Sequence, residues 1–212
     1  MIEMNLKKRY RLFLRNLYLS HSKKYEKIFN KECSIISINC VGGVVSHELH
    51  LRFNSPTINL WFKTKDYLTF LKNIKYYLYN CELKQDVELS RQYMYPVGIL
   101  EDIRIYFQHY ASFEEAKAKW IERTKRINWN NLYIVMVQGE DCTEDELKEF
   151  ENLNFKHKIC FTVKKYDYHS LYFIKGSQKN KKSVRNLCDY KGKFTGKLWL
   201  DEFDWVSFLN NK

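Results

Sequence analysis

His109 is the residue whose type and surroundings most directly suggest catalysis. It follows an alternating apolar segment, residues 103–107, and precedes a helix-start signal at Ser112. Imidazole titrates near neutral pH, so a histidine beside a bound substrate can take a proton from a hydroxyl group. We therefore predict that His109 is a general base. Glu48 and Asp102, two carboxylates beside turn signals, are the alternative bases.

A loop predicted at residues 39–43 is the second candidate for chemistry. It follows the β-branched run 33–38, which predicts a buried strand, and it contains two of the seven glycines. Glycine lets a backbone approach a ligand closely, and ligands of open parallel sheets bind beyond the carboxyl ends of the strands. We expect this loop and His109 to face one crevice. The substrate-binding residues predicted in and near it are Asn39, Gly42, Gly43, His47, Asn54 and Ser55.

Three cations lie along one side of a helix predicted over residues 112–127. Lys119, Arg123 and Arg126 are spaced at i, i+4 and i+7. Like charges in this arrangement repel one another and are stabilised when they meet an anion, so the stripe indicates a phosphate clamp. Carboxylates on the same helix, such as Glu122, could instead neutralise a solvated face.

Motifs of several enzyme classes are missing from the sequence. It shows no Ser/His/Asp arrangement, no HExxH and no Walker lysine, and its six cysteines form no CxxC pair. Cys33, Cys40, His47 and His50 are chemically acceptable zinc ligands, but their spacing differs from the close cysteine pair of structural zinc sites. We expect no bound metal and no cofactor.

The composition indicates a compact basic protein. The 212 residues are 45% hydrophobic and 17% aromatic, which excludes a disordered chain. The net charge of +11 favours anionic partners, although a skewed genomic base composition produces the same excess. Apolar runs are too short to cross a bilayer, and the basic N-terminus lacks the continuous apolar stretch of a signal peptide. We therefore expect a cytoplasmic protein.

Helix and strand signals alternate along the chain. Apolar residues spaced by 3.6 over residues 3–30, with most cations off that stripe, predict a long basic amphipathic helix or helix pair. This helix either packs on the body or docks on anionic lipid headgroups or a partner. The later alternation predicts an α/β fold with a mainly parallel, Rossmann-like sheet flanked by helices. We divide the chain into an N-terminal segment, 1–31, and a single α/β domain, 32–212.

The individual elements follow from the same signals. Besides 33–38, strands are predicted at 57–62, 103–107, 132–137, 158–163 and, at a sheet edge, 171–175. Helices are predicted at 65–79, at 112–127, from Thr143 to about 153, and near the C-terminus, and an exposed loop at 177–185.

Separated motifs also occur in the order found in a bacterial family. They are Asn39-Cys40-Val41-Gly42-Gly43, Phe53-Asn54-Ser55-Pro56-Thr57, Tyr95-Pro96-Val97-Gly98, and His109-Tyr110 through Ser112-Phe113-Glu114-Glu115-Ala116 to Trp120, Arg123 and Arg126-Ile127-Asn128. Over about residues 30 to 165 the chain resembles the bacterial domain-of-unknown-function family numbered 1919, often encountered among capsule and exopolysaccharide biosynthesis genes. The stretch after about residue 165 matches less well.

The resemblance implies surface-polysaccharide assembly, for which we predict glycosyl transfer from a nucleotide sugar. The sequence has no Asp-x-Asp signature, so basic side chains rather than a divalent cation would stabilise the departing diphosphate. His109, or else Glu48 or Asp102, would deprotonate the acceptor hydroxyl. The N-terminal helix would hold the enzyme peripherally at the inner face of the cell membrane, near a lipid-linked saccharide acceptor.

Two other classes of function stay open at this point. A polysaccharide-modifying acyl transferase would use the same histidine with a thioester donor. A non-catalytic nucleic-acid-binding protein would account for the net charge and the basic segment 177–185, but no helix-turn-helix, finger or aromatic RNA-binding signature supports it. We therefore expect nucleic acid to be an unlikely partner.

Overall fold

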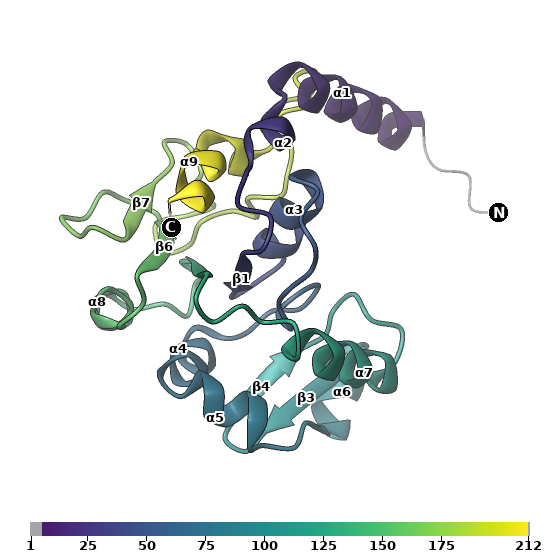
Figure 1. Cartoon of the computed structure of the whole chain (residues 1–212), viewed down its shortest axis with the longest axis vertical. Helices are drawn as coiled ribbons and strands as arrows, with labels where there is room; N and C mark the ends of the chain where they lie inside the picture. Colours follow the sequence, from purple (N-terminus) through teal and green to yellow (C-terminus); the bar gives the residue numbers. More distant parts are fainter. Residues whose placement is uncertain (1–5, 212) are drawn as a thin grey trace.

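The computed structural model describes residues 6–211, which form two β-sheets surrounded by helices (Figure 1). The larger sheet has four parallel strands in the order β1-β5-β6-β7, and the smaller has three antiparallel strands in the order β2-β3-β4. The predicted α/β class with a mainly parallel sheet is confirmed. The strands are β1 (Ser34–Ser37), β2 (Lys84–Gln85), β3 (Val97–Leu100), β4 (Ile103–Tyr106), β5 (Leu132–Val137), β6 (His157–Thr162) and β7 (Leu171–Phe173).

The helices agree with most of the predicted segments. The basic N-terminal stretch is a helix pair, α1 and α2, although residues 1–5 of the predicted segment lie outside the described part of the chain. The helix predicted over 65–79 is interrupted at Asn73. The helices are α1 (Leu6–Ser22), α2 (Lys24–Lys27), α3 (Val41–Glu48), α4 (Thr64–Lys72), α5 (Ile74–Tyr79), α6 (Val87–Tyr93), α7 (Phe113–Thr124), α8 (Glu144–Asn152), α9 (Trp205–Asn210) and the 3-10 turn η1 (Trp199–Glu202).

Strand β5 forms the centre of the parallel sheet because almost all of its side chains are apolar. It pairs with β1 on one side and β6 on the other, and all of its residues after Leu132 are buried. The following helix, α8, begins with the predicted capping box, in which Thr143 and Glu146 satisfy each other's backbone N–H groups. One core of buried side chains extends from this sheet to β3 and β4. The two sheets are therefore packed around shared apolar residues.

The strand predicted at residues 57–62 is not formed. Trp61 makes an isolated antiparallel bridge to Tyr106, and the rest of the segment is irregular. The cause is a side chain that replaces a backbone partner, since Thr57 Oγ1 accepts the hydrogen bond from Ser37 N at 2.9 Å. The segment therefore crosses the end of β1 without extending its sheet.

The prediction of a glycine loop at residues 39–43 is also wrong, because helix α3 already begins at Val41. Neither Gly42 nor Gly43 has a positive φ. A Cβ atom on Gly42 would lie 2.8 Å from Ser37 Cβ, so this glycine allows α3 to pack directly on β1. The residue type therefore serves helix–strand packing here and not a flexible turn.

The segment 177–185 is irregular, as predicted, but it is not uniformly exposed. Ser177, Ser183 and Val184 are buried. Val184 N donates to Gln138 O at 2.9 Å, which attaches the segment to the residues that follow β5. Long-range pairing therefore draws a polar, basic stretch against the body.

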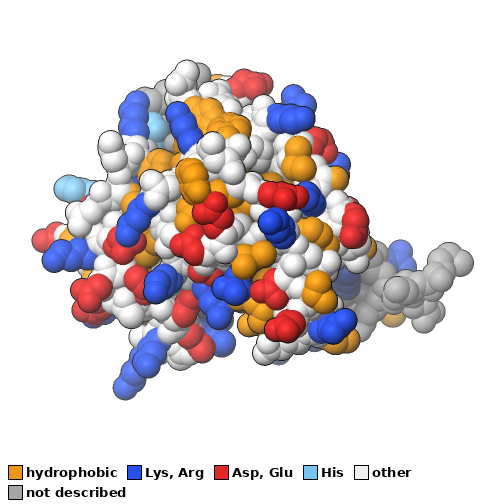
Figure 2. Space-filling model, turned by 90° about the horizontal axis from the view of Figure 1, so that it is seen from below, with side chains coloured by type: hydrophobic (Ala, Val, Ile, Leu, Met, Phe, Trp, Pro, Cys, Tyr) orange, Lys and Arg blue, Asp and Glu red, His pale blue; other side chains and the backbone are white. Residues whose placement is uncertain are grey.

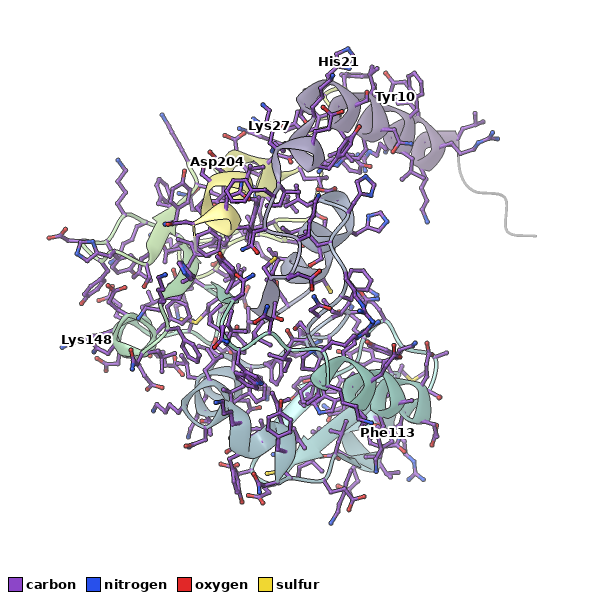
Figure 3. All side chains as sticks on the ribbon, viewed as in Figure 1. Tyr10, His21, Lys27, Phe113, Lys148 and Asp204 are labelled. Atoms are coloured by element: carbon purple, nitrogen blue, oxygen red, sulfur yellow. The ribbon has the colours of Figure 1, made fainter. Side chains whose placement is uncertain are left out.

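The surface combines mixed charge with one projecting helix. On the face seen in Figure 2, basic and acidic side chains are interspersed among the residues that the structure describes. In Figure 3, Tyr10 and His21 point outward from α1, at the opposite end of the molecule from Phe113 at the start of α7. The described helices include none with an apolar stretch of the length that a membrane span requires.

Candidate functional site

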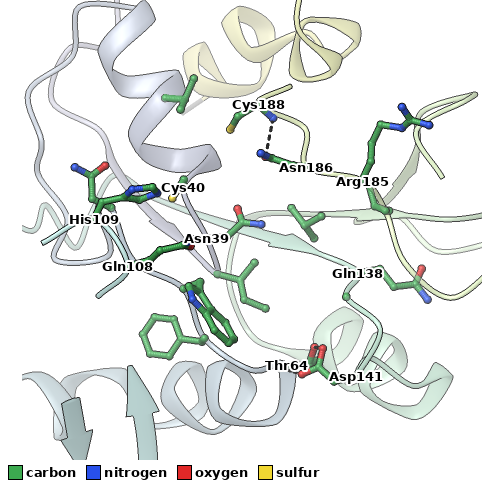
Figure 4. A pocket seen from close by; sticks show the side chains of 18 residues that line it. Asn39, Cys40, Thr64, Gln108, His109, Gln138, Asp141, Arg185, Asn186 and Cys188 are labelled. Carbon is green, nitrogen blue, oxygen red and sulfur yellow. Dashed lines mark hydrogen bonds between the residues drawn. The ribbon is translucent and has the colours of Figure 1, made fainter. Parts of the chain in front are cut away.

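A pocket of about 820 Å³ lies beyond the carboxyl ends of β1 and β5 (Figure 4). Ligands of parallel α/β sheets bind at this edge, where loops and helix ends converge. Its volume lies within the range of ordinary small-molecule sites, roughly 300 to 1,000 Å³. The lining comes from five segments, which are residues 38–44, 59–64, 108–109, 137–141 and 184–188.

The pocket brings together the two segments for which a shared crevice was predicted. Asn39 and Cys40 follow β1, and Gln108 and His109 follow β4 by way of Phe107. Asn39 Oδ1 accepts a hydrogen bond from Val41 N at 3.1 Å, which fixes this side chain at the start of α3. His109 therefore lies where a substrate held at the end of the sheet would meet it.

Among the described side chains that line this pocket, Arg185 is the only one from a Lys or Arg residue. It lies across the pocket from His109 (Figure 4). Its guanidinium group stacks over Trp199 at 4.6 Å, and Nη2 donates to Gln178 O at 3.1 Å. Arg185 Nε is buried without a hydrogen-bond partner in the described part of the chain. A buried donor without a partner is uncommon in folded proteins, which sets Arg185 apart from the other lining residues.

Trp61 supplies a rigid aromatic surface to the same pocket. Its ring stacks on Tyr106 at 3.9 Å with an interplanar angle of 11°, and Nε1 donates to Tyr95 Oη at 3.2 Å. Tyr93 packs edge-on against Trp61 and Tyr106. The indole is therefore fixed by Tyr106 against one face and by Tyr93 and Tyr95 at its edge.

Among the described residues that line the pocket, Asp141 is the only one with a carboxylate side chain. Its two oxygens accept hydrogen bonds from Thr64, one from the backbone N at 2.7 Å and one from Oγ1 at 3.0 Å. Thr64 is the first residue of α4. Asp141 therefore ties the end of β5 to this helix.

Two cysteine thiols, Cys40 and Cys188, also line the pocket. Burial raises the pKa of Cys40, and burial with the nearby Cys40 raises the pKa of Cys188 further. Both side chains are therefore thiols at neutral pH. Since the thiolate is the nucleophilic form, the structure does not prepare either cysteine for attack.

The predicted phosphate clamp of Lys119, Arg123 and Arg126 is not assembled at the pocket, and Arg126 lies beyond the end of α7 at Thr124. Lys119 and Arg126 form ion pairs with Glu122, at 2.8 and 3.2 Å. Arg123 is buried, and its Nη1 donates to Tyr110 Oη at 2.6 Å. Their spacing placed these cations on one side of a helix, but carboxylate and phenol partners occupy that side, and none of the three lines the pocket.

The two alternative bases also lie elsewhere. Glu48, at the end of α3, forms an ion pair with the buried Arg15. Asp102 lies in the turn between β3 and β4 and accepts a hydrogen bond from Tyr77 Oη at 2.7 Å. Neither carboxylate lines the pocket. Of the three predicted bases, His109 is the one that lines the pocket.

The other residues predicted near the crevice are dispersed. His47 is exposed on α3. Asn54 and Ser55 are buried, and Ser55 Oγ lies 3.0 Å from Thr57 Oγ1 in the turn beneath β1. Gly42 and Gly43 are inside α3. Of the substrate-binding residues predicted from sequence, Asn39 is the one that lines the pocket.

The spacing that suggested zinc does not converge on a metal site. Cys33 is buried, and His50 packs edge-on against Tyr25 at 5.0 Å. Across residues 6–211, no group of three or more His, Cys, Asp or Glu side chains is placed to hold a metal ion.

Several lining residues were missed by the sequence analysis. Gln138 comes directly after β5 and Asp141 lies in the loop that follows, so the rule that selected Asn39 after β1 would also have selected them. Arg185 gave no such signal, because its place depends on Val184 pairing with Gln138.

Comparison with known proteins settles the relationship of the chain. The family model described as "Domain of unknown function (DUF1919)" matches residues 12–210. The chain belongs to this family. An uncharacterized protein of Haemophilus influenzae is 40% identical over 186 residues, which cover 87% of each chain. The family resemblance read from the motifs is confirmed, and it extends past residue 165 almost to the C-terminus.

Proposed function

We propose that this member of the family is a glycosyltransferase that moves a sugar from a nucleotide-sugar donor in bacterial surface-polysaccharide biosynthesis. The observation that carries the proposal is the meeting of His109, Trp61 and Arg185 in one pocket at the carboxyl edge of a parallel sheet. Each of them suits one part of such a donor and its acceptor. The polysaccharide context comes from the family resemblance.

The lining chemistry favours a sugar diphosphate over an apolar ligand. Side-chain amides can pair with sugar hydroxyls, and the flat face of Trp61 can pack on a sugar ring. Arg185 has donors available for the diphosphate, whose negative charge grows as it departs. The proposal therefore assigns phosphate binding to Arg185 in place of the cations of α7. The amide side chains are Asn39, Asn59, Gln108, Gln138 and Asn186.

In the proposed reaction His109 accepts the proton of the acceptor hydroxyl. The hydroxyl oxygen attacks the anomeric carbon of the donor sugar, and the bond from that carbon to the diphosphate oxygen breaks with its electron pair leaving on the diphosphate. Asp141 is already engaged by Thr64, so the proposal gives charge stabilisation to Arg185 and requires no cofactor. The acceptor is a lipid-linked saccharide, met on the cytoplasmic side of the membrane.

A panel of ligands tests this function directly. Nucleotide sugars, the corresponding nucleoside diphosphates, acetyl-coenzyme A and a short DNA duplex are compared by thermal stabilisation and calorimetry. We expect binding of a nucleotide sugar that weakens in Arg185→Ala and persists in Lys119→Ala. Stabilisation by acetyl-coenzyme A without any nucleotide sugar would instead establish acyl transfer, and salt-sensitive retention of DNA alone would establish nucleic-acid binding.

The base is tested once a donor is known. His109→Ala should bind that donor normally and turn it over about 100-fold more slowly with a saccharide acceptor, because proton transfer contributes on the order of 10²-fold or more. An unchanged rate would remove His109 from the mechanism.

A further inference from the structure

Helix α1 leaves a row of apolar side chains uncovered. Leu6, Tyr10, Phe13 and Leu17 recur at helical spacing, and all four are exposed, Leu6 by 83% and Phe13 by 62%. They define the outer stripe of α1. Figure 3 shows its member Tyr10 directed away from the body. A stripe of this kind is costly in water unless another surface covers it.

The opposite side of α1 is the side that the protein holds. Arg15 is buried, and its Nε donates to Glu48 Oε1 at 2.8 Å while Nη1 donates to Asp201 Oδ2 at 2.5 Å. Lys24, in α2, also pairs with Asp201, at 3.2 Å. These contacts fix the rotation of α1 about its axis, so the outer stripe faces away from the body by construction.

A neighbouring loop adds to the exposed apolar surface. Residues 190–197 are fastened to α1 because Gly196 O accepts from Arg15 Nη1 at 3.1 Å and Tyr190 Oη donates to Arg11 O at 3.2 Å. This loop presents Phe194, which is 73% exposed. Two independent segments therefore display large apolar side chains at the same end of the molecule.

The charge around the stripe selects the kind of surface that covers it. Helix α1 carries five Lys or Arg residues and no Asp or Glu. Of these, Arg9 is exposed and follows the stripe residue Leu6 by three positions, so it lies beside the stripe. Cations next to large apolar side chains are typical of helices that lie in the headgroup region of anionic membranes. A second copy of the chain would bring the same cations to the contact and repel the first.

We propose that α1 and loop 190–197 form a docking surface for a bilayer containing anionic lipids. The outer stripe and Phe194 enter the interface, and exposed cations of α1 such as Arg9 meet lipid phosphates. This surface does not depend on the reaction proposed for the pocket. It gives that pocket an orientation, since Arg15 joins α1 to the end of α3, and the start of α3 lines the pocket.

Vesicle flotation of the full-length protein tests the surface. Vesicles of phosphatidylglycerol with phosphatidylethanolamine are compared with neutral phosphatidylcholine vesicles. We expect partitioning onto the anionic vesicles that is about tenfold or more above that on the neutral ones and that declines with added salt. Equal partitioning on both compositions, or none on either, would overturn the proposal.

Matched variants identify the residues involved. The double variant Leu6→Ser with Phe13→Ser, and the charge reversal Arg9→Glu, should each lower partitioning by about tenfold or more without changing the melting temperature, because these side chains are exposed. Met94→Ser and Lys148→Glu, exposed positions far from α1, serve as controls and should bind like the wild type. Wild-type binding by the α1 variants would contradict the proposal. The proposal would also be contradicted if light scattering showed a dimer of the wild type and a monomer of the Leu6→Ser, Phe13→Ser variant, because a second copy of the chain would then cover the stripe.

Discussion

Arg123 and Arg185 each place a guanidinium group over an aromatic ring, Phe53 at 5.5 Å and Trp199 at 4.6 Å. Arg123 is buried and donates to Tyr110 Oη, which in turn donates to Ile58 O at 2.8 Å. Arg185 lines the pocket and keeps a buried Nε without a partner among the described residues. Similar stacking therefore accompanies a guanidinium paired with Tyr110 at one position and, at the other, a buried donor without a partner in the described part of the chain.

This difference lies in the partners of each arginine and not in its sequence context. Arg123 belongs to a regular stripe of cations that looks like an anion site, whereas Arg185 lies in an irregular polar segment. Glu122 forms ion pairs with Lys119 and Arg126, and Tyr110 accepts a hydrogen bond from Arg123, while long-range pairing places Arg185 at the end of the sheet. Substitutions at the two positions should therefore separate stability from binding.

Arg123→Ala should produce the largest effect, a loss of about 2 to 4 kcal/mol in the free energy of unfolding. The change removes a charge-assisted hydrogen bond to Tyr110 and the packing of the long side chain on Phe53. Urea denaturation measures the loss, and Lys119→Ala on the exposed face of α7 should change stability by less than about 0.5 kcal/mol. Equal effects of the two variants would mean that Arg123 has no special structural role.

Arg185→Ala should weaken binding of a nucleoside diphosphate about 10-fold to 100-fold, because one charge-assisted hydrogen bond contributes about 1.5 to 3 kcal/mol. Its effect on stability should be smaller than that of Arg123→Ala, since Arg185 is partly exposed and makes one hydrogen bond to the backbone. Calorimetry with the diphosphate gives the affinity. Unaltered affinity would exclude Arg185 from the phosphate site.

A second comparison concerns two adjacent glycines that the sequence analysis treated alike. A Cβ atom on Gly42 would lie 2.8 Å from Ser37 Cβ, whereas the nearest atom to a Cβ on Gly43 is Ile58 Cγ2 at 3.4 Å. Gly42→Ala should therefore cost about 1 to 2 kcal/mol through overpacking. Gly43→Ala should be neutral or stabilising by up to about 1 kcal/mol, because alanine favours helix. Thermal denaturation of both variants checks this, and equal melting temperatures would show that α3 can move away from β1.

These pairs show how far the sequence predicts this protein. Strand β5 and helix α8 were predicted almost to the residue, because continuous apolar burial and a capping box are local signals. The strand expected at 57–62 failed because Thr57 supplies a side-chain acceptor where a sheet would need a backbone group. The pattern of apolar residues along the sequence does not show whether a side-chain oxygen or a backbone carbonyl accepts such a hydrogen bond.

The candidate site was predicted in part for the same physical reason. Asn39 and His109 follow strands, and the strand-end rule locates them without knowledge of the pairing. Arg185 and Trp61 reach the pocket through contacts with distant residues. Arg185 follows Val184, which pairs with Gln138, and Trp61 forms an isolated bridge with Tyr106. Local patterns therefore identify the edge of the sheet, while the position of Arg185 is determined by tertiary contacts.

The smallest expected effect comes from a comparison of two carboxylates that both hold a backbone segment. Asp141 secures Thr64 at the pocket, and Glu151 accepts hydrogen bonds from His169 N at 3.2 Å and from Ser170 N at 3.1 Å, far from it. Burial raises the pKa of Glu151, but the hydrogen bonds from Ser170 and His169 outweigh it and hold the pKa below its usual value. Ionised Glu151 thus stabilises the connection into β7.

Glu151→Gln should therefore lower the free energy of unfolding by about 1 kcal/mol at neutral pH, the usual contribution of a hydrogen bond on a partly exposed side chain. A carboxylate with a lowered pKa in the folded state stabilises the protein above the pKa of the unfolded chain and loses this effect as the pH falls through the folded pKa. The difference between wild type and variant should accordingly shrink below about pH 4. Urea denaturation across pH measures it. A difference that persists at low pH would show that the charge of Glu151 does not account for its contribution to stability.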